Sequence, residues 1–217
     1  MERIKYPKTL HLPWSEGLQN DDRLLDDINC FSGKDVIITE KMDGENFVIS
    51  RDFCHARSLT DGALTPKQGW SREWIKNLWG IIRYEMPDDI RIHGENLYAE
   101  HSIKYYNLPS YFFVFGISDN DKFLSWDDVI EWCSLLNLEH VPVIFDGQWD
   151  EDMVKNLWPF NSQFADMPEG YVVRVRDGFL INDFPTNTAK FVRKNHIQSD
   201  ETWFKGEWLR NRIRKVI

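Results

Sequence analysis

The amino-acid sequence predicts an α+β fold in which two mainly antiparallel sheets have helices packed outside them. Two observations predict this class. Asp-Gly pairs at 43–44 and 177–178 each separate two runs of β-branched and aromatic residues, as turns between antiparallel strands do. The other short strands are interspersed with helical segments, which favours this class over a doubly wound parallel sheet.

The first part of the chain is expected to wrap over a sheet and then enter it. Residues 1–35 place prolines and glycines around a short acidic segment that can form a helix. Strands at 36–38 and 47–49 follow, with Asp43-Gly44 as the turn between them, and residues 51–58 return as more strand.

The middle of the chain alternates helices and strands. Ser71 is the expected N-cap of a helix that ends near residue 83 and buries its apolar residues at helical spacing. A strand at 90–95 leads to residues 111–117, whose almost continuous apolar run predicts a central strand buried on both faces. The remaining elements are expected to be a helix capped by Ser125, an edge strand at 141–145, a short helix at 150–157, strands at 169–176 and 179–181, and a basic strand at 190–195.

Length and composition indicate one domain in a reducing compartment. The 217 residues are enough for a single buried core. The three cysteines lie far apart without a CxxC pair, and no signal peptide or run of transmembrane length is present. We expect a cytoplasmic monomer that does not contact a membrane.

The C-terminal part is basic although the whole chain carries a net charge of −9. Residues 190–217 contain eight Lys and Arg against three Asp and Glu, so a local surface can bind phosphates. A solvated helix face is an equally good interpretation of the last ten residues. The expected organisation is a domain at 1–200 and a basic helix at 201–217 packed on it.

Lys41 is the residue with the most chemical content. A lysine at a strand end is most often simply solvated. Alternatively it is a nucleophile, because a lowered pKa leaves an amine unprotonated at neutral pH. Its surroundings, Lys41-x-Asp43-Gly44-x-Asn46, resemble the nucleotidyl-lysine motif of the covalent nucleotidyltransferases, which comprise ATP-dependent DNA ligases, RNA ligases and mRNA capping enzymes.

Four later segments resemble further motifs of this superfamily in the same order. Gly94-Glu95 matches the glutamate that contacts ribose. Phe115 matches the aromatic residue that stacks on adenine, although Gly116 replaces the usual Asp, so Phe113 stays an alternative. The last two matches are Glu169-Gly170, which supplies a metal-binding carboxylate, and Lys190, Arg193 and Lys194, of which one or more contact the α-phosphate.

Within the superfamily the chain is most similar to compact ATP-dependent RNA ligases, because His101 follows the second motif, His196 and Gln198 follow the last, and no OB-fold domain has room. The resemblance implies a nucleotidyltransferase (ATP-grasp-like ligase) domain whose two sheets form a nucleotide cleft. It also implies ATP and Mg²⁺ or Mn²⁺, and RNA with 5′-phosphate and 3′-hydroxyl ends. The expected intermediates are a lysyl–AMP and an AMP-capped RNA.

The resemblance also implies a role for each site residue. Lys41 attacks ATP while Lys190, Arg193 or Lys194 lowers its pKa, and Glu169 binds the metal. The nucleotide-binding residues are Glu40 on the adenine amino group, Asp43 and Asn46 in the lysine loop and on ribose, Arg57 on a phosphate, Glu95 on ribose and Phe115 on adenine.

Two other function classes stay open at this point. One is a nucleotidyltransferase that does not seal strands, such as a capping-type guanylyltransferase or a protein-modifying enzyme. The other is a nucleic-acid-binding module that has kept the fold and lost the chemistry.

Overall fold

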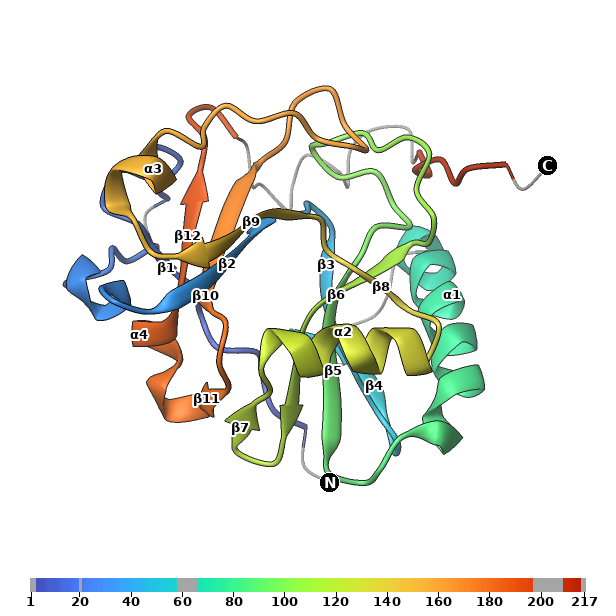
Figure 1. Cartoon of the computed structure of the whole chain (residues 1–217). Helices are drawn as coiled ribbons and strands as arrows, with labels where there is room; N and C mark the ends of the chain where they lie inside the picture. Colours follow the sequence, from blue (N-terminus) through green and yellow to red (C-terminus); the bar gives the residue numbers. More distant parts are fainter. Residues whose placement is uncertain (1–2, 20, 58–65, 197–208, 216–217) are drawn as a thin grey trace.

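The computed structural model describes residues 3–19, 21–57, 66–196 and 209–215, with two sheets side by side (Figure 1). The first sheet has the order β1-β12-β10-β2-β9. Its strands are β1 (Leu10–His11), β12 (Thr188–Val192), β10 (Gly170–Val175), β2 (Asp35–Glu40) and β9 (Val143–Gln148).

The second sheet has the order β11-β7-β6-β5-β3-β4, and β8 also pairs with β6. Its strands are β11 (Phe179–Leu180), β7 (Lys122–Phe123), β6 (Phe112–Asp119), β5 (Ile90–Asn96), β3 (Glu45–Ser50), β4 (Cys54–Ala56) and β8 (Glu139–His140). Only β1–β12 and β6–β8 are parallel among the strand pairs described. The predicted α+β class with mainly antiparallel sheets is confirmed.

Helices cover these sheets. The α-helices are α1 (Pro66–Ile82), α2 (Trp126–Leu135), α3 (Glu151–Lys155) and α4 (Phe184–Asn187), and 3-10 turns lie at Ile28–Phe31, Arg83–Glu85 and Ile181–Asp183. Ser125 caps α2 as predicted, in a capping box with Asp128. The other predicted cap is wrong, because α1 begins at Pro66 and not after Ser71; proline is well suited to the first helical turn. No described helix is long and apolar enough to cross a membrane.

Strand alternation divides the core into two main parts. On β2, Val36 and Ile38 face a cluster that also contains Val154 of α3. Ile37 points to the other face and joins the larger cluster, which is formed mainly by the second sheet with α1 and α2. β2 is therefore buried on both faces, and one of them faces the second sheet.

Both Asp-Gly pairs connect the two sheets, so their prediction as turns between paired strands is wrong. β2 and β3 belong to different sheets, as do β10 and β11. The strands pair with distant partners instead, and these pairings are not visible in local turn chemistry. Glycine is needed here for close approach: a Cβ on Gly44 would lie 2.6 Å from Asn96 O, and one on Gly178 would lie 2.9 Å from Phe123 O.

The described part of the predicted C-terminal helix is extended. Residues 201–208 lie outside the described residues, while 209–215 form isolated bridges from Arg210 to Ala99 and from Ile213 to Leu108. The physical reason is long-range pairing, because the backbone of this segment bonds to the 97–108 loop instead of to itself.

Candidate active site

Lys41 lies where the chain leaves the first sheet. It follows Glu40, the last residue of β2, and its N–H donates to Gly170 O at 2.9 Å. Since Tyr171 of β10 is opposite Glu40, Glu169 comes to lie beside Lys41. Lys41 Nζ is 2.6 Å from Oε1 and 2.7 Å from Oε2 of Glu169, whose side chain is 0% exposed. The predicted nucleophile, whose side chain is 21% exposed, and the predicted metal ligand, which is fully buried, form an ion pair.

The carboxylates around Lys41 keep it protonated in the free protein. Burial lowers the pKa of Lys41, but the charges of Glu169, Glu95 and Asp43 outweigh burial and raise this pKa above its ordinary value. The expectation that basic residues lower the pKa of Lys41 is therefore wrong for the protein without nucleotide and metal. An attack by this amine requires that the surrounding negative charge first be neutralised.

Glu95 reaches Lys41 from the second sheet. It is on β5 opposite Asn46 of β3, and its Oε1 accepts from Gly44 N at 3.1 Å. Burial, with a smaller contribution from Glu169, raises the pKa of Glu95 to about 8, although Lys41 acts in the opposite direction. The lysine loop therefore packs against the second sheet through this carboxyl group.

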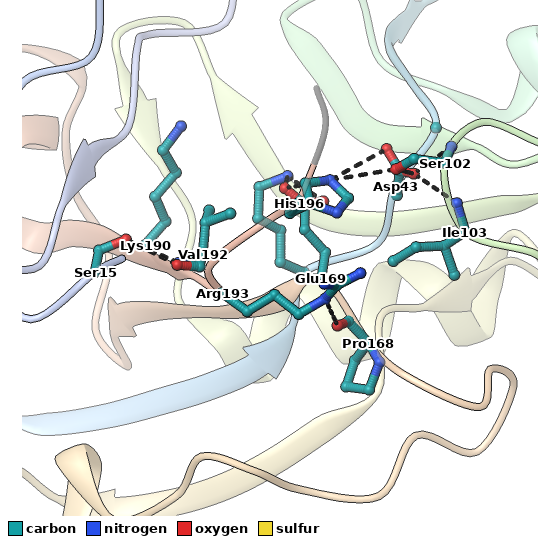
Figure 2. Close-up of polar contacts among 12 residues, drawn as sticks. Ser15, Asp43, Ser102, Ile103, Pro168, Glu169, Lys190, Val192, Arg193 and His196 are labelled. Atoms are coloured by element: carbon teal, nitrogen blue, oxygen red, sulfur yellow. Dashed lines mark hydrogen bonds and ion pairs between the residues drawn. The ribbon is translucent and has the colours of Figure 1, made fainter. Parts of the chain in front are cut away.

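Asp43 is held by the loop at 97–108. Its Oδ2 accepts from Ser102 N at 2.9 Å, Ser102 Oγ at 2.6 Å and Ile103 N at 3.0 Å (Figure 2). Its own N–H donates to the buried hydroxyl of Tyr105 at 2.8 Å. These bonds fix the carboxylate and leave Oδ1 toward His196, whose Nε2 is 4.0 Å away.

A cluster of possible metal ligands is formed by Asp43, Glu169 and His196, whose ligand atoms all lie within 4.8 Å of one another. His196 Nε2 is 3.4 Å from Glu169 Oε1 (Figure 2). Burial lowers the pKa of His196, against the opposite effects of Glu169 and Asp43, and so favours the neutral imidazole that can bind a metal. The two carboxylates provide the oxygen ligands that suit Mg²⁺ and Mn²⁺ alike.

The three predicted basic residues, Lys190, Arg193 and Lys194, differ in burial and in their partners. Lys190 on β12 is 12% exposed and its Nζ is 3.5 Å from Asp22 Oδ1. Burial and the nearby charge of Lys41 lower the pKa of Lys190. Its neighbours Ala189 and Phe191 belong to the cluster that contains Val36 and Ile38, so Lys190 lies on the opposite face of the sheet. Arg193 is half-buried with Nε donating to Pro168 O at 3.1 Å, while Lys194 is exposed.

The two aromatic candidates for base stacking, Phe113 and Phe115, differ in exposure. Phe113 is 1% exposed within the core, with its ring centroid 5.6 Å from that of Phe164. Phe115 is only partly buried, and its ring meets the edge of the Tyr6 ring at 5.0 Å. Phe115 is thus the aromatic side chain with surface available to a ligand.

The remaining predicted residues line the same region. Glu40 is buried and accepts from Ser162 Oγ at 2.8 Å, and burial raises its pKa to about 7. Asn46 Oδ1 is buried without a hydrogen-bond partner among the described residues. Arg57 is exposed, with N donating to Asn46 O at 2.9 Å and Nε donating to Tyr6 O at 3.3 Å.

Sequence reasoning assigned no role to three residues at this site. His196 stood out only as a histidine shortly after the basic strand, and Tyr6 and Asp22 come from the N-terminal wrap, where no chemistry was expected. Asp22 Oδ2 also lies 3.1 Å from Nε2 of the buried His11. No local pattern indicates these contacts; the position of Asp22, for example, depends on β1 pairing with β12, which brings His11 beside Lys190.

Comparison with known families gives one match. The sequence profile of the RNA ligase family matches residues 34–192, which include Lys41, Glu95, Glu169 and Lys190. No curated protein matches the chain by sequence.

Solved structures of an RNA ligase from Naegleria gruberi share the fold. A variant with AMP and Mn is 17% identical with a TM-score of 0.59, over 88% of this chain and 56% of that chain. A variant with ATP and Mn is 17% identical with a TM-score of 0.57, over 92% and 60%. The protein with PPi is 18% identical with a TM-score of 0.55, over 87% and 57%, so the match spans less than two thirds of these chains.

Proposed function

Since the chain belongs to the RNA ligase family, we propose that it is an ATP-dependent RNA ligase that joins 5′-phosphate and 3′-hydroxyl ends. The observation that carries this proposal is the ion pair of Lys41 and Glu169, with Glu95 and Asp43 around it, at the crossing between the two sheets. A merely solvated lysine does not require such a set of carboxylates.

In the first step, Lys41 Nζ attacks the α-phosphorus of ATP. An N–P bond forms, the bond from the α-phosphorus to the bridging oxygen breaks, and pyrophosphate leaves with the electron pair. The lysine must first lose a proton to solvent, which the carboxylates around it oppose in the free protein, and a second proton leaves to solvent as the N–P bond forms. The buried cation of Lys190 stabilises the negative charge that develops on the phosphate.

Asp43, Glu169 and His196 fit a divalent cation such as Mg²⁺ or Mn²⁺. When bound, the cation neutralises the carboxylates and the ATP phosphates. With that charge neutralised, burial and Lys190 favour the free amine of Lys41. The Naegleria gruberi structures with ATP or AMP and Mn support this choice of ligands for the family fold.

We assign the nucleotide contacts from the positions of the side chains. The adenine ring stacks on Phe115, and its amino group approaches Glu40. Glu95 and Asn46 bind ribose, and the unpartnered Oδ1 of Asn46 supplies an acceptor for a ribose hydroxyl. Asp43 sets the lysine loop, while Arg57, Arg193 and Lys194 bind phosphates at the rim.

In the later steps AMP passes from Lys41 to the 5′-phosphate of RNA, and the 3′-hydroxyl of the second strand then displaces AMP. We further propose that the enzyme works as a monomer in the cytoplasm. Its three free cysteines suit a reducing compartment.

A sealing assay with two kinds of RNA tests the proposal. With ATP, metal and 5′-phosphate RNA, the unaltered chain should join the ends and Lys41→Ala should not. With RNA that already carries a 5′-AMP cap, Lys41→Ala should still seal, because the lysine step is bypassed. Lys155→Ala, in the exposed end of α3, is the matched control. The assay is repeated with GTP in place of ATP. Transfer of GMP without sealing would indicate a capping-type enzyme, and transfer of neither AMP nor GMP would indicate a binding module.

A further inference from the structure

The C-terminal segment at 209–215 is fixed to the loop at 97–108 by a buried asparagine. Asn211 is 1% exposed, and its Nδ2 donates to Leu97 O at 2.8 Å and Ala99 O at 3.2 Å. Its Oδ1 accepts from Tyr105 N at 2.8 Å, and its backbone O accepts from Tyr111 OH at 3.1 Å. The segment is therefore a fixed strand-like element, which Figure 1 shows in red beside the green loop.

Its extended form gathers three arginines on one side. Side chains alternate along an extended backbone. Asn211 is buried and points inward, while Arg210, Arg212 and Arg214 are exposed; Ile213, 37% exposed, lies between Arg212 and Arg214. We call these three residues the arginine row. Alternate residues on such a backbone are about 6.6 Å apart, so the row presents regularly spaced cations along a line.

The surroundings of the row are also basic and aromatic. Across 97–108 and 209–215 the sequence has five lysines and arginines and one acidic residue, Glu100, in a chain of net charge −9. The Arg210 guanidinium lies 5.8 Å from the Tyr98 ring centroid, and Lys104 Nζ lies 5.6 Å from that of Tyr106. Among the described residues, Arg212 and Arg214 form no ion pair with a carboxylate.

One residue links this surface to the active site. Tyr105 O accepts from Arg212 N at 3.1 Å, and the hydroxyl of the same tyrosine accepts from Asp43 N at 2.8 Å. The row therefore lies on the outer side of the loop that holds Asp43.

We propose that the arginine row binds the sugar–phosphate backbone of single-stranded RNA and leads its end toward Lys41; this rests on the proposed ligase function. A line of cations matches a linear polyanion, whereas a single phosphate group requires converging donors. The nearby rings of Tyr98 and Tyr106 provide faces on which bases stack.

The test is the affinity of the chain, without ATP, for a 5′-phosphorylated single-stranded RNA of about 12 nucleotides, measured by fluorescence anisotropy at several salt concentrations. The triple variant Arg210→Gln, Arg212→Gln, Arg214→Gln should bind more weakly. The slope of log affinity against log salt should fall by about 2, because each phosphate contact contributes about 0.7. The triple Arg→Lys variant should keep the slope, which separates loss of charge from loss of fold.

The matched control neutralises Arg23, Lys122 and Lys155, three exposed cations on other elements, to glutamine. It changes the net charge equally and should leave the salt slope nearly unchanged. If the Arg→Gln variant of the row and the control variant bind RNA with the same affinity, the row is not the RNA site. The same conclusion follows if the Arg→Gln variant keeps the salt slope of the unaltered chain. Lysyl–AMP formation by the unaltered chain is measured separately: RNA binding without any adduct would contradict the ligase proposal and leave the RNA site standing.

Discussion

Lys41 Nζ lies 2.6 Å from Oε1 of Glu169, a carboxylate with 0% exposed side-chain area. Lys41 follows β2 and Glu169 precedes β10, which are neighbouring strands of the first sheet, and Lys41 begins the crossing to the second. This pair holds the lysine as an ammonium ion in the free protein. We propose that the amine is released only when another cation neutralises this carboxylate.

Glu169→Gln should test whether this carboxylate binds the metal in addition to pairing with Lys41. The substitution keeps the shape but removes the charge that attracts a metal. We expect the metal concentration for half-maximal adduct formation to rise by about 10- to 100-fold. The measurement is the rate of lysyl–AMP formation against Mg²⁺ or Mn²⁺ concentration, with Glu131→Gln on the exposed face of α2 as control. An unchanged metal dependence would show that Glu169 does not bind the ion.

Glu40→Gln should alter how stability depends on pH. Burial raises the pKa of Glu40 to about 7 in the folded chain, from its ordinary value of 4.5 when unfolded. Between these values the folded state binds the extra proton, so the stability that this group contributes is complete below about pH 4.5 and is lost as pH rises to about 7.

Relative to the unaltered chain, Glu40→Gln should therefore gain up to about 1.4 kcal/mol per pH unit across this window and no more above it. Urea unfolding at several pH values measures the difference, and Glu85→Gln, at an exposed carboxylate, is the control. A stability difference between Glu40→Gln and the unaltered chain that does not change with pH would contradict the raised pKa.

Asp22→Asn should disturb the active site from outside the matched family region. Asp22 lies 3.5 Å from Lys190 Nζ and 3.1 Å from His11 Nε2, and its side chain is 7% exposed. We expect a loss of about 1–3 kcal/mol in unfolding free energy, because the partly buried Lys190 loses its counter-charge. The apparent KM for ATP in adduct formation should also rise. The neighbouring Asp21, 84% exposed, gives the matched control Asp21→Asn; equal effects of the two variants would remove Asp22 as a positioning residue.

Phe115→Ala and Phe113→Ala distinguish the two aromatic candidates. Phe115 is partly exposed, so its loss should weaken ATP binding by about tenfold or more, which corresponds to the 1–3 kcal/mol of a base stack. Phe113 fills the core, and its loss should cost about 3–5 kcal/mol of stability. Isothermal titration with ATP and urea unfolding on both variants check this. If Phe113→Ala alone weakened ATP binding in a stable chain, the assignment would be reversed.

Local sequence chemistry predicted much of the fold. The cap at Ser125, the strand at Ile90–Asn96 and the buried strand at Phe112–Asp119 follow from side-chain type and periodicity, and the structure contains them. The edge position of β9 likewise follows from the proline beside it. These features depend on near neighbours in the chain.

What could not be predicted depends on distant partners. Asp43-Gly44 has the chemistry of a hairpin turn, but β2 pairs with β10 and β9, so the same residues cross between sheets. The arginine-rich C-terminal segment has helix-forming residues, but the side chain of Asn211 donates hydrogen bonds to backbone carbonyls more than a hundred residues away, which hold the segment extended. The raised pKa of Lys41 likewise results from carboxylates that three separate segments bring together, at residues 43, 95 and 169.

The most direct test of the central claim is the mass of the intact chain after incubation with ATP and Mg²⁺ or Mn²⁺, followed by peptide mapping. The account predicts a covalent AMP on Lys41, formed without RNA and absent from Lys41→Ala. An adduct that persists in Lys41→Ala, or no adduct with the unaltered chain across metals and pH, would contradict it.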